Sequence, residues 1–196
     1  MQKDAAQLKA QLAQDNRLLV ENVTNKIEKK KAPLLFNLAE LQAECSKLFK
    51  ISPDKTLEIA QALYEAKLTT YPRTDARVLS TAVADVIEDN LEGLAKGQYH
   101  ADIAEKIILQ NMYDGLSKSK YTDDSKITDH YAIIPTGETD VSKLNDLQLS
   151  VYKLITDRFL SIFYPPAEYN KTEILLKHAN GEHFYASEKI LEKPGW

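Results

Sequence analysis

Apolar residues recur along this chain at two different spacings. Spacings of three and four residues, which place apolar side chains on one face of an amphipathic helix, occur in several segments. These predicted helices cover residues 2–14, 37–49, 53–66 and 145–163, with shorter pieces between 80 and 117. In the third helix the spacing directs Leu57, Ala60, Leu63 and Tyr64 towards the core.

Three of these helices begin with residues that typically cap helices. Asn145 is followed three positions later by Gln148, and Asn37 is followed in the same way by Glu40. This spacing is typical of a capping box, in which two side chains satisfy backbone N–H groups of the first turn. Ser52 precedes Pro53–Asp54, which combines a cap, a proline at the first helical position and an acidic residue in the first turn.

Strand patterns lie only near the two ends of the chain. Residues 18–27 are rich in β-branched and aliphatic side chains, and a lysine-rich connector is predicted at 26–33. Residues 169–178 and 182–187 form two further candidate strands, joined by the turn-forming pair Asn180–Gly181 that indicates a β-hairpin.

These patterns predict an α+β fold that is mostly helical. We expect a helical domain at residues 34–144, inserted between two pieces of a strand-containing second domain at 1–33 and 145–196. The last piece would consist of a helix and the hairpin.

Composition and charge narrow the classes of protein that are possible. The 196 residues are 43% hydrophobic and 28% charged, which is typical of a soluble globular domain. No apolar run approaches the roughly 20 residues that span a bilayer, and no signal peptide is evident. The single cysteine, Cys45, excludes an internal disulfide framework and suits a reducing compartment, so we expect a cytoplasmic location. Cys45 itself is expected to be a half-buried helix residue.

The net charge argues against a large phosphate-binding surface. The chain has 25 basic and 29 acidic side chains, a balance of −4, whereas nonspecific nucleic-acid affinity comes mainly from clustered lysine and arginine. Any surface for nucleic acid must therefore be local, or most of it must lie outside this chain.

The first candidate for chemistry is Tyr71, in the sequence Thr-Tyr-Pro-Arg-Thr-Asp at residues 70–75. In an extended backbone, side chains two residues apart point the same way, so Tyr71 and Arg73 could share one phosphate. A free phenol has a pKa near 10, and a neighbouring positive charge favours the nucleophilic phenolate. An ordinary turn, with Arg73 paired to Asp75, is the alternative interpretation.

The second candidate is His130, which follows Asp129 and precedes an apolar stretch. A carboxylate beside a histidine can orient it or favour its charged form, although an isolated histidine in such a place is often structural. No Cys/His spacing indicates a zinc site, and no glycine-rich pattern indicates a nucleotide site.

Several strings, taken together and in order, resemble type IA DNA topoisomerases. Residues 33–42 resemble the entry to the gate domain of that family, 55–75 its active-site stretch, and 129–136 its histidine motif. Residues 163–169 and 194–196 are similar to the topoisomerase III branch.

The resemblance implies a role for each candidate residue. Tyr71 would attack a phosphate of single-stranded DNA to form a 5′-phosphotyrosine link, Arg73 would hold that phosphate, and His130 would help to position it. The supporting and DNA-binding residues would be Thr74, Asp75, Arg77 and Thr128. The family's topoisomerase III pattern often has a second histidine where this chain has Tyr131.

The resemblance also implies that this chain is a central fragment of a longer enzyme. The family's toprim domain, with its acidic Mg²⁺ site, and its strand-binding segments have no counterpart here, and no Asp-x-Asp-x-Glu string occurs. We therefore expect no metal in this chain, Mg²⁺ bound elsewhere in the full-length enzyme, and an inactive isolated fragment. The expected partners are single-stranded DNA, the missing domains and in some settings a helicase, but no membrane.

Two other classes of protein could also contain a tyrosine such as Tyr71. A tyrosine recombinase needs a His-x-x-Arg element, but Ile133 stands three residues after His130. A non-catalytic helical interaction module would leave Tyr71 with a structural role only, and a fully packed Tyr71 ring would favour that class.

Overall fold

The computed structural model describes Lys9, Leu12 and residues 17–196. The helix predicted at residues 2–14 lies outside the described residues except at Lys9 and Leu12. Contacts divide the chain into two compact units, one formed by Met1–Lys30 with Pro166–Gly195 and the other by Lys31–Pro165 with Trp196. We call these the sheet unit and the helical unit.

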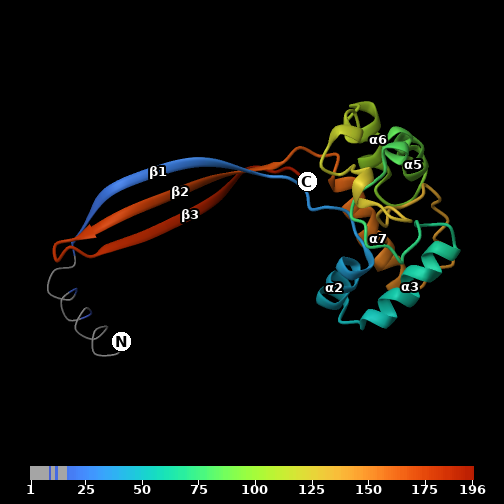
Figure 1. Ribbon diagram of the computed structural model, residues 1–196, viewed down its shortest axis with the longest axis horizontal. Coiled ribbons are helices and arrows are strands. Elements are labelled where there is room, and N and C mark those ends of the chain that lie inside the picture. The colour runs from blue at the N-terminus through green and yellow to red at the C-terminus, as the bar shows by residue number, and fades with distance from the viewer. Residues whose placement is uncertain (1–8, 10–11, 13–16) are drawn as a thin grey trace. The chain divides into compact units, whose positions relative to one another are not determined.

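The sheet unit contains three antiparallel strands, with the middle strand hydrogen-bonded to both others (Figure 1). The strands are β1 (Leu18–Lys30), β2 (Ala167–His178) and β3 (His183–Lys193). The turn between β2 and β3 places Gly181 at φ +92°, a conformation that favours glycine, and the predicted hairpin is therefore present.

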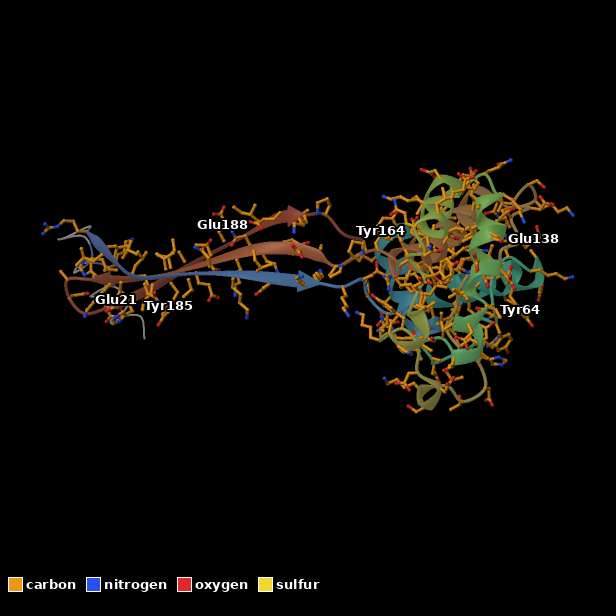
Figure 2. All side chains as sticks on the ribbon, turned by 90° about the horizontal axis from the view of Figure 1, so that it is seen from above. Glu21, Tyr64, Glu138, Tyr164, Tyr185 and Glu188 are labelled. Atoms are coloured by element: carbon orange, nitrogen blue, oxygen red, sulfur yellow. The ribbon has the colours of Figure 1, made fainter. Side chains whose placement is uncertain are left out.

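All three strands are longer than the sequence pattern predicted. β1 continues to Lys30, through residues that the sequence assigned to the connector at 26–33, because ion pairs with the other two strands stabilise those positions. Lys29 lies 3.0 Å from Glu168, and Lys189 lies 2.6 Å from Glu28. Figure 2 shows the side chains of this unit, including Tyr185, which is 83% exposed on β3.

The helical unit contains six α-helices among the described residues. They are α2 (Leu38–Phe49), α3 (Pro53–Glu65), α4 (Thr81–Asp85), α5 (Ile87–Ala95), α6 (Ala101–Leu109) and α7 (Asp146–Ser161), with 3-10 turns at Leu116–Lys118 and Asp124–Lys126. The helix starts at 38, 53 and 146 confirm the three predicted caps, but only the Asn37 half of the predicted Asn37–Glu40 capping box forms, and the Glu40 carboxylate pairs with Arg77. Asn37 accepts from the Glu40 N–H at 2.9 Å, Ser52 accepts from the Lys55 N–H at 3.2 Å, and Asn145 with Gln148 forms the full capping box.

Helix α7 belongs to the helical unit, although the sequence grouped residues 145–196 with the hairpin. Its side chains are buried in both hydrophobic clusters of the unit: Phe159 and Leu160 in one, Val151 and Ile155 in the other. The units divide instead at Pro165/Pro166, because the helix loses its core contacts only beyond its C-terminal turn.

Cys45 is more buried than its sequence position indicated. It is fully buried in α2, and burial raises the pKa of its thiol to about 11. The neutral thiol is a poor nucleophile, so Cys45 is a core residue.

The candidate active site

Two segments far apart in the sequence pair beside Tyr71. The Thr70 N–H donates to the Ile134 carbonyl at 2.9 Å, and the Thr136 N–H donates to the Leu68 carbonyl at 3.1 Å. Thr69 and Pro135 form an isolated antiparallel bridge between these two hydrogen bonds. The end of the tyrosine motif is therefore held directly against the residues that follow His130.

Two threonine hydroxyls strengthen this junction. Thr70 Oγ1 donates to the Ala132 carbonyl at 2.9 Å and accepts from the Ile134 N–H at 3.0 Å. Thr74, which is only 6% exposed, donates to the His130 carbonyl at 2.9 Å. The backbone is thus fixed on both sides of Tyr71 and at His130.

The Tyr71 ring is partly exposed and lies between two other rings. Its centroid is 4.4 Å from that of His130, at an interplanar angle of 43°, and 5.3 Å from that of Tyr64, at 80°. The prediction that Tyr64 faces the core is wrong: its side chain is 40% exposed, at the surface of the helical unit (Figure 2). The chain turns after α3, with Lys67 at φ +63°, and the Tyr64 ring meets the Tyr71 ring edge-on.

The two arginines of the motif have different environments. Arg73 is exposed, and in the part of the chain that the structure describes no carboxylate pairs with its guanidinium. The alternative turn with an Arg73–Asp75 ion pair is therefore absent. Arg77 instead donates through Nε to the Leu35 carbonyl at 3.2 Å and pairs with Glu40 at 3.1 Å.

The remaining residues that were predicted to bind DNA differ in how exposed they are. Asp75 and Thr128 are exposed, and the Asp75 carbonyl accepts from the Asn37 side chain at 3.0 Å. Thr74 is buried, whereas the half-buried Arg77 is held by its two bonds. Asp75 and Thr128 are the more exposed candidates for ligand contact.

A cleft of about 560 Å³ opens beside Tyr71. Sequence reasoning missed most of its lining, because Thr69 and Thr70 have the pattern of a buried strand and Tyr64 that of a core residue. We call it the tyrosine cleft; its lining residues are Tyr64, Glu65, Lys67, Thr69, Thr70, Tyr71, His130, Tyr131 and Thr136. Burial raises the pKa of the Tyr131 phenol, so this hydroxyl stays protonated near neutral pH.

Comparison with known proteins decides the family. A family model described as DNA topoisomerase matches residues 1–196. The chain belongs to the DNA topoisomerase family. It is 38% identical over 186 residues to DNA topoisomerase 3 of Bacillus subtilis, covering 93% of this chain and 25% of that protein. It is 36% identical over 197 residues to DNA topoisomerase 3 of Bacillus licheniformis, covering 97% of this chain and 26% of that protein.

A solved topoisomerase has the same fold in its matching part. Full-length topoisomerase I from Thermotoga maritima matches with a TM-score of 0.61 at 24% sequence identity, over 89% of this chain and 28% of that one. The resemblance to type IA topoisomerases and to the topoisomerase III branch is confirmed, as is the α+β fold class. The topoisomerase chain described here spans about a quarter of the length of the curated relatives that it matches.

The described residues of this topoisomerase chain do not form a metal site. Among them, no group of three or more His, Cys, Asp or Glu side chains is placed to hold an ion. Among the same residues, no helix is long and apolar enough to cross a membrane.

Neighbouring threonines give a matched test of the junction. Thr70→Val removes two hydrogen bonds and leaves a buried carbonyl and N–H unpaired, so we expect the free energy of unfolding to fall by about 1–3 kcal/mol. Thr69→Val removes a buried hydroxyl that has no partner, and we expect equal or greater stability. Urea unfolding measures both changes, and equal losses for the two variants would contradict this account of the junction.

Proposed function

We propose that this chain is the central part of a type IA DNA topoisomerase that cuts single-stranded DNA with Tyr71. The observation that carries the proposal is the environment of the phenol. It is partly exposed and in contact with the His130 ring, two residues before an exposed arginine without a carboxylate partner. A ring with a structural role only would need neither this exposure nor that free cation.

The proposed reaction is a reversible transfer of a phosphodiester bond. The Tyr71 oxygen attacks the phosphorus, a new O–P bond forms, and the bond from phosphorus to the 3′ oxygen breaks. The products are a 5′-phosphotyrosine link and a free 3′-hydroxyl. Because the link retains a phosphodiester, religation needs no ATP, and another strand can pass before the break is closed.

The chain supplies two groups for the charge that this reaction develops. Arg73 can donate two parallel hydrogen bonds to the phosphate oxygens, which favours attack and stabilises the transition state. His130 can position the phosphate and, when protonated, adds positive charge beside the phenol. Asp75 and Thr128 are the exposed candidates for further DNA contacts, and we assign Thr74 and Arg77 to positioning.

Other domains of the longer protein would supply the groups that this chain lacks. The net charge of −4 supports a DNA path that lies largely outside this chain. We place Mg²⁺ and the acid–base groups in a toprim domain of the same polypeptide, beside separate strand-binding segments. The helical unit, Lys31–Pro165, would swing as a gate about hinges near residues 31 and 165. We expect a helicase as a partner of the whole enzyme.

Replacement of one oxygen tests the proposed nucleophile. In the whole topoisomerase polypeptide, Tyr71→Phe keeps the ring and its contacts but removes the attacking atom, so covalent adduct on a suicide oligonucleotide should fall to background. Tyr185→Phe, at an exposed position in the sheet unit, should leave adduct formation unchanged. The adduct is measured as a shifted band on a denaturing gel, and a normal yield from Tyr71→Phe would exclude the role.

The isolated chain should bind single-stranded DNA weakly and relax no DNA. With Arg73 and His130 as the two phosphate contacts, log Kd should change with log salt by a slope of roughly 1.4. Fluorescence anisotropy over a salt series measures the slope, and a plasmid assay with Mg²⁺ measures relaxation. Efficient Mg²⁺-dependent relaxation by this chain alone would contradict the assignment of the missing groups to other domains.

A further inference from the structure

The tyrosine cleft has more aromatic surface than the cutting reaction requires. Tyr64, Tyr71 and His130 form a continuous series of ring contacts along it. Only the Tyr71 oxygen takes part in the proposed bond exchange. The Tyr64 ring, 40% exposed, therefore presents an unused aromatic surface next to the nucleophile.

Away from Tyr71 and His130, the charges of the cleft do not favour a second phosphate. Its lining contains one ammonium group, on Lys67, and one carboxylate, on Glu65, whose Oε1 accepts from Gln61 at 3.1 Å. These opposite charges offset each other, so this part of the cleft offers no excess of positive charge to an anion. A neutral ligand with a flat aromatic face fits this lining better.

The cleft also contains a polar atom without a partner. Thr69 is 1% exposed, and its hydroxyl makes no hydrogen bond within the described part of the chain. The adjacent Thr70 hydroxyl makes two hydrogen bonds, so a missing partner is not a general property of this segment. Buried polar groups are nearly always paired, so the Thr69 hydroxyl requires a partner, which a water molecule or a ligand entering the cleft would supply.

We propose that the tyrosine cleft binds the base of a nucleotide that adjoins the phosphate attacked by Tyr71. The base would stack on Tyr64 and exchange a hydrogen bond with the Thr69 hydroxyl. Stacking on aromatic side chains is a general means of binding single-stranded nucleic acid. This inference rests on the proposed function, and it assigns to the cleft the holding of the strand beside the nucleophile.

Abasic oligonucleotides test the base contact in the whole polypeptide. A series of suicide substrates, each lacking one base near the cut, should contain one position at which the wild-type adduct yield falls about tenfold. Tyr64→Ala should lower the yield about tenfold on the intact strand but show almost no further loss at that position. Tyr185→Ala, an exposed tyrosine of the sheet unit, should retain the wild-type pattern.

A second variant separates recognition from folding. Thr69→Val should weaken the discrimination between an intact and an abasic strand while urea unfolding shows no loss of stability. The proposal is overturned if Tyr64→Ala leaves the yield unchanged, or lowers it equally on every strand, as expected if a protein segment fills the cleft. In both cases Tyr71 still forms its adduct, so the proposed function stands. Absence of any adduct in the wild type would refute that function first.

Discussion

The site depends on the pairing of residues 68–70 with residues 132–136. This pairing joins segments more than 60 positions apart through two backbone hydrogen bonds and the two bonds of the Thr70 hydroxyl. Tyr71 directly follows one paired segment and His130 precedes the other, so the junction brings their rings to 4.4 Å. Thr74, bonded to the His130 carbonyl, closes the loop on the other side. The proposed nucleophile and its partner therefore owe their proximity to backbone pairing.

Local features of the fold could be predicted from the sequence because neighbouring residues determine them. Asn37, Ser52 and Asn145 each start a helix by binding N–H groups two or three positions ahead. The assignment of α7 to the helical unit depends on side chains from many distant segments, and helical periodicity does not identify those partners. The length of β1 also depends on distant residues, since Lys29 and Glu28 of this strand form ion pairs with the other two strands.

The candidate site could be predicted only as two separate motifs. The spacing of residues around Tyr71 does not distinguish Arg73 from Arg77. In the structure Arg73 has no carboxylate partner among the described residues, whereas Arg77 is held by Glu40 and the Leu35 carbonyl. Tyr64 has the spacing of a core residue, yet it lies where α3 ends and no element covers it. Family resemblance supplied the roles, and the structure adds which side chains are available for them and the cleft beside the nucleophile.

The central claim is that the folded chain itself holds Tyr71 against His130. The most direct measurement is a nuclear Overhauser effect between the ring protons of the two residues, with isotope labelling to resolve them. The account predicts a strong cross-peak in the wild-type chain without DNA, and a weaker one in Thr70→Val. Well-resolved signals from both rings, with no cross-peak in the folded wild type, would contradict it.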